Sequence, residues 1–182
     1  MASKLSQNFQ TFTRMWYLID GRGQVVGRLA SMLSGVLQGK IKPIYHPATD
    51  IGDHVVVINT GDVVFTGRKW EKKLYRHHTG YPGGLKEIVA EKLHNKDETM
   101  VLRKAVYGML PKNNLRKKRM RRLHLFPTDI HPYQLNITAT LEGPCLSLKR
   151  LEDYTKEEIE NYPKLFDTSH LLKLDLEMDS YT

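Results

Sequence analysis

Residues 16–39 read WYLIDGRGQVVGRLASMLSGVLQG. The apolar run from Trp16 to Ile19 predicts a short buried strand, and the glycines that follow it predict a turn. From Val26 onward, apolar residues recur every three or four positions, as on one face of a helix, until Gly39 marks the predicted C-terminal end of that helix. The stretch therefore predicts a strand, a turn and a helix in succession.

The next apolar run, Val55–Asn59, reads VVVIN and consists mostly of β-branched residues. Such a run is typical of a strand buried on both faces, as in a parallel sheet covered by helices. Further along, apolar spacing predicts one helix over Leu85–Leu93 and another over Glu98–Met109, with Asp97 as the cap of the second. Leu123–Phe126 is predicted to return as a strand.

The turn after the first strand also resembles a dinucleotide-binding fingerprint, because Gly21, Gly23 and Gly27 precede a helix. The glycine spacing is one residue too long, however, and no acidic residue follows about 20 positions later to hold a ribose. We therefore predict no cofactor. A nucleotide-dependent α/β enzyme stays open as an alternative, although no activated nucleophile or general acid–base pair supports it.

Charge is distributed unevenly along the chain, which holds 28 basic and 20 acidic side chains for a formal net charge of +8. Residues 101–136 contain nine basic side chains and one acidic side chain, whereas residues 137–182 contain five and ten. A basic face predicts a nucleic acid or another acidic surface as partner, and an acidic tail is repelled by either. The sequence thus predicts a basic body with an acidic tail.

The stretch Gly67–Lys86, GRKWEKKLYRHHTGYPGGLK, mixes cations with aromatic rings around a single acidic residue, Glu71. Cations neutralise phosphates and flat rings stack on unpaired bases, so this mixture indicates RNA binding. Its glycines predict a tight turn that lets a partner approach the backbone. The simpler interpretation is a solvated, lysine-rich hairpin.

Two further segments strengthen the RNA-binding interpretation. Lys40–Pro47 is a basic loop stiffened by proline, and seven of the eleven residues of Lys112–Arg122 are basic. A helix over the second segment would be charged nearly all round, unlike the solvated face of a core helix. The residues predicted to bind RNA are Lys40, Lys42, Tyr45, His46, Arg68, Lys69, Lys72, Lys73, Tyr75, Arg76, His77, His78, Tyr81, Lys86, Lys112, Asn113, Arg116, Lys117, Lys118, Arg119, Arg121, Arg122 and His131.

Other site types find little support in the sequence. A single cysteine, Cys145, excludes an intramolecular disulfide and fits a reducing compartment. The eight histidines show no ligand spacing with that cysteine, so no metal site is predicted. No apolar run approaches the roughly 20 residues that span a bilayer, so no membrane association is predicted. The first 15 residues lack acids, a composition compatible with organelle import.

Several strings occur in one order across roughly residues 16–134: WYLID, VGRLAS, GKIK, DIGDHVVVIN, TGRK, HTGYPGGLK, AVYGMLPKN and HPYQ. They resemble the universal large-subunit ribosomal protein L-thirteen family. The resemblance implies a three-layer α/β/α fold with a parallel central sheet, and a structural, non-catalytic role in binding large-subunit rRNA. It also implies neighbouring large-subunit ribosomal proteins as partners, and no homo-oligomer is expected.

Two departures from the family pattern refine this expectation. The chain has LRKKRMRR where the family usually has LGR, and it continues past the usual end with an acidic tail. Such an extension resembles the mitochondrial members of animals, which implies the mitochondrial matrix, with the cytoplasm as the alternative. We expect an N-terminal segment over residues 1–15, an α/β domain over 16–136, and an acidic extension over 137–182.

One further alternative uses the same basic surface, namely a free mRNA-binding regulator. The acidic extension carries many leucines and aromatic residues, too many for a purely solvating tail. We therefore expect the extension to pack on this protein's own domain or on adjacent ribosomal proteins, away from RNA.

Overall fold

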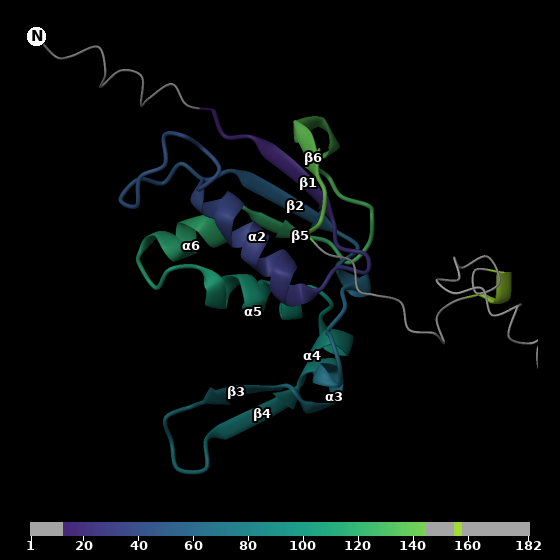
Figure 1. Ribbon diagram of the computed structural model, residues 1–182. Coiled ribbons are helices and arrows are strands. Elements are labelled where there is room, and N and C mark those ends of the chain that lie inside the picture. The colour runs from purple at the N-terminus through teal and green to yellow at the C-terminus, as the bar shows by residue number, and fades with distance from the viewer. Residues whose placement is uncertain (1–12, 145–154, 158–182) are drawn as a thin grey trace, which may run out of the picture. The chain divides into compact units, whose positions relative to one another are not determined.

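The computed structural model describes residues 13–144 and 155–157 (Figure 1). The chain divides into two units, residues 1–147 and residues 148–182. All helices and strands discussed below belong to the first unit. Most of the predicted acidic extension, and with it the expected packing of that extension, lies outside the described residues.

A four-stranded sheet forms the centre of the first unit (Figure 1). Its strands are β1 (Trp16–Asp20), β2 (His54–Ile58), β5 (Leu123–Leu125) and β6 (Ala139–Leu141), in the order β5-β2-β1-β6. Every neighbouring pair is parallel. A parallel central sheet flanked by helices confirms the predicted α/β class and is consistent with a three-layer α/β/α arrangement. β6 lies within the segment predicted as the extension.

One face of the sheet packs against helix α2 (Val26–Gln38) and helix α5 (Met100–Met109). Burial removes the apolar stripe of α2 from water, at roughly 2 kcal/mol per fully buried leucine. α2 ends where the glycine predicted, because Gly39 adopts a left-handed φ of 79° and its N–H donates to Val36 O at 2.9 Å. The side chains that form this core include Ile19, Leu29, Leu33, Leu37, Val55, Val57, Val101, Leu102 and Val106.

The opposite face carries stacked rings instead of a long helix. Trp16 and His54 stack with their ring centroids 4.1 Å apart, and His124 of β5 stacks beside Trp16 at 5.3 Å. β5 and β6 lie at opposite edges of the sheet, so the connection between them must cross it. That connection contains Tyr133 and the short 3-10 helix η2 (Gln134–Asn136), and the Tyr133 ring packs 5.2 Å from that of Trp16.

Between β2 and α5 the chain leaves the sheet and forms a hairpin. A short 3-10 helix, η1 (Thr60–Asp62), and helix α3 (Lys69–Lys72) lead into strands β3 (Leu74–His78) and β4 (Leu85–Val89), which pair antiparallel. Figure 1 shows the hairpin on the α5 side of the unit, away from the sheet. Helix α4 (Ala90–Lys96) follows.

The helix predicted over Leu85–Leu93 is therefore wrong in its first half. Leu85, Ile88, Val89 and Leu93 have helical spacing, but Leu85–Val89 pairs with β3, and the helix begins only at Ala90. The preceding glycine turn brings the two segments together, so backbone pairing between strands prevails over local periodicity.

The other predicted elements are confirmed. α5 occupies the segment predicted as the second helix but begins at Met100, and the prediction of Asp97 as its cap is wrong, because Thr99 is the N-cap residue. Asp97 lies just before the helix and accepts a hydrogen bond from Thr99 N at 2.9 Å. Helix α6 (Leu115–Met120) follows, and β5 forms where the last strand was expected. Within the described ranges, no helix has the length and apolar character needed to cross a membrane.

Candidate nucleic-acid interface

The tip of the hairpin depends on its glycines. Thr79 N donates to Gly84 O at 3.1 Å and Gly84 N donates to Tyr81 O at 2.9 Å, which closes the loop. Gly80 and Gly83 have φ values of 92° and 71°, a region that favours glycine. A Cβ on Gly84 would collide with Thr79 Oγ1 and with Tyr81 O. The loop thus holds Tyr81 exposed in the turn that joins β3 to β4.

The strands of the hairpin present polar groups on both faces. Their register places His77 opposite Lys86 on one face and Arg76 opposite Glu87 on the other. Arg76 Nε lies 2.5 Å from Glu87 Oε1, so part of its charge is neutralised within the hairpin, although an exposed pair of this kind is weak. The predicted residues that are exposed in this region are Arg68, Lys69, Lys72, Lys73, Arg76, His77, His78, Tyr81 and Lys86.

The base of the hairpin is anchored by aromatic packing. Trp70 meets Phe65 edge-on, with centroids 4.7 Å apart, and both rings pack against the core. Tyr75 is partly buried, and burial raises the pKa of its phenol. The ammonium groups of Lys73 and Lys104 lie 5.5 Å and 5.6 Å from the Tyr75 ring centroid. These contacts place Tyr75 at the junction between hairpin and domain.

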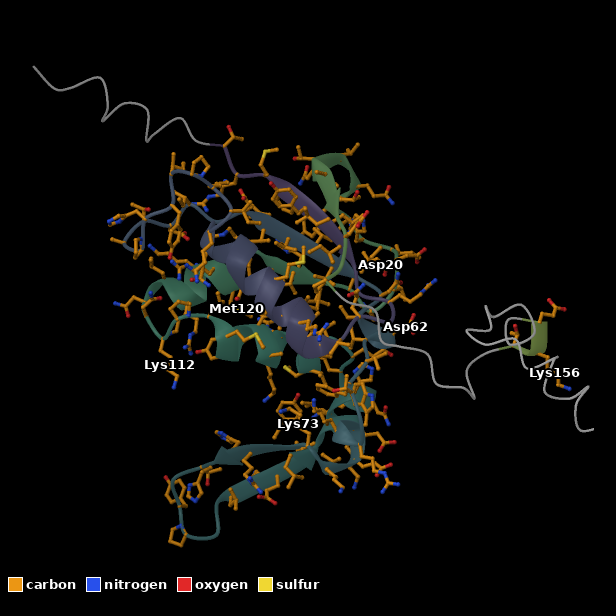
Figure 2. The ribbon with its side chains drawn as sticks, in the orientation of Figure 1. Asp20, Asp62, Lys73, Lys112, Met120 and Lys156 are labelled. Atoms are coloured by element: carbon orange, nitrogen blue, oxygen red, sulfur yellow. The ribbon has the colours of Figure 1, made fainter. Side chains whose placement is uncertain are left out.

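The basic segment after α5 divides into exposed and internal residues. Arg116 lies over the Tyr107 ring at 4.6 Å and donates to Leu110 O and Pro111 O at 3.0 Å and 3.1 Å, so it covers the C-terminal end of α5. Figure 2 shows Lys112 in the loop before α6, directed outward. The predicted residues that are exposed here are Lys112, Asn113, Lys117, Lys118 and Arg121.

Three predicted residues are buried. Arg119 is 1% exposed and Arg122 is 6% exposed, whereas the sequence indicated a segment charged nearly all round. Both guanidinium ends of Arg122 lie 2.6 Å from the carboxylate of Asp50, and Arg122 also donates to Leu37 O at 3.1 Å. His131 is buried beside Phe126. The structure therefore does not bring Arg119, Arg122 and His131 to the exposed basic surface.

The basic loop Lys40–Pro47 is tied to the domain through the carboxylate of Asp53. Lys42 Nζ lies 2.6 Å from Asp53 Oδ1, which also accepts a hydrogen bond from Met15 N at 2.9 Å. Burial opposes ionisation of Asp50, but its hydrogen bonds and ion pair with Arg122 outweigh that cost and hold the pKa of Asp50 below its usual value. Of the predicted residues of this loop, Lys40 and His46 are exposed, while Lys42 and Tyr45 are half-buried.

Backbone N–H groups of the glycine turn after β1 donate hydrogen bonds within the fold. Gly21 N and Gly23 N donate to Ile58 O and Asp62 O, both at 3.0 Å, and Val26 N donates to Val64 O at 3.1 Å. A pyrophosphate needs such N–H groups free. Figure 2 shows Asp20 and Asp62 at this end of the unit, where their negative charge would also repel it. The geometry is that of a strand–helix turn and argues against the dinucleotide-binding alternative.

Two pockets flank α5, and sequence reasoning missed part of their lining. The first has a volume of ≈ 640 Å³ and includes Arg28, Lys69, Lys73 and Lys104. The second has a volume of ≈ 510 Å³ and includes Arg103, Lys104, Lys117 and Arg121. Neither lining contains an acidic side chain.

The missed residues are Arg28, Arg103 and Lys104. The charge excess of residues 101–136 included the last two, so a signal existed for them. Arg28 is the one basic residue of the mostly apolar helix α2, and only the tertiary structure brings it to the same pocket as Lys104. Among residues 13–144 and 155–157, no group of three or more His, Cys, Asp or Glu side chains is placed to hold a metal ion.

A parallel α/β domain with an exposed basic hairpin and basic pockets beside α5 has the features of a nucleic-acid-binding protein. Residues 14–132 match the family model of Ribosomal protein L13. The chain belongs to this family, as its sequence motifs predicted.

Relatives in the family come from animals and bacteria. The chain is 42% identical over 167 residues to "Large ribosomal subunit protein uL13m" of Drosophila melanogaster, covering 91% of this chain and 94% of that protein. It is 45% identical over 130 residues to "Large ribosomal subunit protein uL13" of Geobacter sulfurreducens, covering 71% of this chain and 91% of the relative. It is 49% identical over 121 residues to the protein of the same name from Syntrophus aciditrophicus, covering 66% of this chain and 85% of the relative.

Proposed function

We propose that this protein is a structural constituent of the large subunit of the mitochondrial ribosome, where it binds and stabilises folded rRNA. Family membership supports the ribosomal role, and a ribosomal protein of this family is a non-enzyme component. The mitochondrial assignment is supported by the share of this chain that each relative matches. The match to the Drosophila protein reaches into residues 137–182, because it spans 91% of the chain, whereas the two bacterial relatives match 71% and 66%.

The observation that carries the RNA-binding part is the concentration of exposed cations on the hairpin and around α5 and α6. Lysine and arginine side chains there bridge phosphates that rRNA folding brings close together, and this relieves the repulsion between RNA segments. His77, His78 and Tyr81, exposed near the tip, contact bases or sugars. Arg119, Arg122 and His131 are left out of this interface because they are buried.

The proposed partners are large-subunit rRNA and neighbouring large-subunit ribosomal proteins. The acidic extension is assigned to protein contacts, because laying it along rRNA would bring like charges together. The proposed location is the mitochondrial matrix, with residues 1–15 as the segment whose composition suits import.

Sedimentation tests this proposal directly. The tagged full-length chain is expressed in animal cells, and a mitochondrial lysate is fractionated on a sucrose gradient before and after magnesium depletion separates the subunits. The chain is expected to sediment with large-subunit rRNA in both gradients. Sedimentation in light fractions with mRNA would instead support a free regulator, and a free soluble protein that retains bound nucleotide would support the enzyme alternative.

A further inference from the structure

The pocket of ≈ 640 Å³ lies where the base of the hairpin meets the α/β domain. Three parts of the chain line it: the start of α2, the segment from Phe65 through α3 to the start of β3, and the second half of α5. Figure 2 shows Lys73 at this junction. Four cations and no acidic side chain line the pocket, namely Arg28, Lys69, Lys73 and Lys104.

Two of these cations lie near the same aromatic ring. Lys73 lies between α3 and β3, and Lys104 lies in α5, yet both ammonium groups lie within 5.6 Å of the Tyr75 ring centroid. Two like charges in a lining that holds no acidic side chain favour an anion in the pocket. Lys69 Nζ is held nearby by Thr66 Oγ1 at 2.9 Å.

Two helical glycines form an open part of the pocket lining. Gly27 in α2 and Gly108 in α5 are exposed, and a Cβ built on either would contact nothing within 4 Å. Glycine weakens a helix relative to alanine, so a glycine at these positions costs stability without any packing reason inside the protein. The missing side chains leave both helix backbones open to close approach by a partner.

We propose that this pocket binds one strand of RNA backbone, with its phosphates between Arg28, Lys73 and Lys104 and its sugar–phosphate chain against Gly27 and Gly108. This inference rests on the proposed rRNA-binding function and names the part of RNA that the site takes. A pocket of this volume is far smaller than a double helix, so it admits a single strand. Phe65 already packs on Trp70, and the Tyr75 ring already has two lysine ammonium groups within 5.6 Å of its centroid, so the contact is to backbone and not to stacked bases.

The sharpest test leaves every charge in place. Gly27→Ala and Gly108→Ala are combined in the full-length chain, and Gly35→Ala is the control, because Gly35 is also helical and a Cβ on it would likewise meet nothing within 4 Å, but it does not line the pocket. Binding is measured with a full-length transcript of mitochondrial large-subunit rRNA. The double variant is expected to bind roughly tenfold or more weakly, while the control binds like the unaltered chain. The unfolding midpoint should rise in both, because alanine favours a helix over glycine, so weaker binding by the double variant would not reflect unfolding. Equal affinity for the double variant and the control would overturn the proposal.

A second pair of variants tests the charges. Lys73→Ala with Lys104→Ala is compared with Lys92→Ala with Lys96→Ala, which removes the same charge from exposed positions on α4. The pocket variant is expected to reduce the slope of log affinity against log salt by about two units, and the control much less. If the unaltered chain does not bind the transcript, the proposed function fails. If the unaltered chain binds and the two double variants show equal salt slopes, the proposed binding of RNA backbone in this pocket is wrong and the proposed function stands.

Discussion

Arg122 and Asp50 form a bidentate ion pair in which Nη1 and Nη2 each lie 2.6 Å from a carboxylate oxygen. Arg122 precedes β5 and Asp50 precedes β2, so the pair joins two segments 72 residues apart in the chain. Arg122 also donates to Leu37 O near the end of α2. Arg121, the adjacent residue, is exposed. The basic run Lys112–Arg122 thus supplies both a buried ion pair that links two segments of the domain and an exposed surface charge.

These neighbours are expected to respond in opposite ways to substitution. Arg122→Ala leaves Asp50 without its buried partner and should lower the free energy of unfolding by roughly 3 kcal/mol. Arg121→Ala should change it by less than about 0.5 kcal/mol, yet weaken rRNA binding. Urea denaturation and filter binding on the two single variants measure both quantities. Equal free energies of unfolding for the two variants would contradict the stabilising role of the Arg122–Asp50 pair.

The hairpin offers a second prediction. Lys72→Ala and Lys86→Ala should each reduce the salt slope of rRNA binding by about one unit if each cation neutralises one phosphate. Glu87→Gln should act in the opposite direction, because it frees Arg76 from the 2.5 Å pair and removes a negative charge. Titrations at several salt concentrations test all three. Unchanged slopes for both lysine variants would exclude the hairpin from the interface.

Much of the fold follows from local sequence signals, and the exceptions have a common cause. β1, α2 and β2 were predictable because their apolar periodicity agrees with their burial. β4 was not, because its apolar residues have helical spacing and only pairing with β3 makes the segment a strand. The burial of the arginines could not be predicted either, because no local sequence pattern indicates that Asp50, which is distant in the chain, forms an ion pair with Arg122.

The same distinction applies to the candidate site. The glycine-rich tip and the lysines of Gly67–Lys86 stand together in the sequence, so a single stretch indicated them. The pocket beside α5 draws Arg28 from α2 and Lys104 from α5, which only packing of the two helices brings together. Sequence therefore predicts contiguous binding surfaces better than assembled ones.

The stacked rings on the sheet predict a pH dependence. Burial lowers the pKa of His54 and of His124 below the ordinary value of 6.5, and for His54 the nearby His124 and Arg122 add to the effect. His54 Nδ1 and His124 Nε2 are buried without a hydrogen-bond partner. The unfolded chain consequently binds protons more readily than the folded protein. Their neutral forms support full stability above pH 6.5, and stability falls as the pH drops below it.

The expected loss is up to about 1.4 kcal/mol per pH unit for each histidine, between pH 6.5 and the lower folded pKa values. His54→Phe combined with His124→Phe keeps flat rings in place and should flatten this slope. His77→Phe on the exposed strand is the control and should leave the slope unchanged. Asp20, Asp50 and Asp97 have lowered pKa values and titrate below 3.8, outside this window. Denaturant titrations at intervals between pH 5 and 7.5 measure the free energy of unfolding of each variant. An unchanged pH slope in the double variant would contradict the role of these two histidines.

The acidic extension gives the last prediction. Residues 137–182 hold ten acidic and five basic side chains, so contact with rRNA would be repulsive, whereas the leucines among them suit a protein surface. Removing residues 148–182 spares β6, which ends at Leu141, and so leaves every strand of the sheet in place. The shortened chain should bind isolated rRNA as tightly as the full chain or slightly more so. Its incorporation into the large subunit should fall, which gradient fractionation against the tagged full-length chain would measure. Crosslinks that join Glu152–Glu160 mainly to rRNA would show instead that the extension lies on RNA and that repulsion does not govern its place.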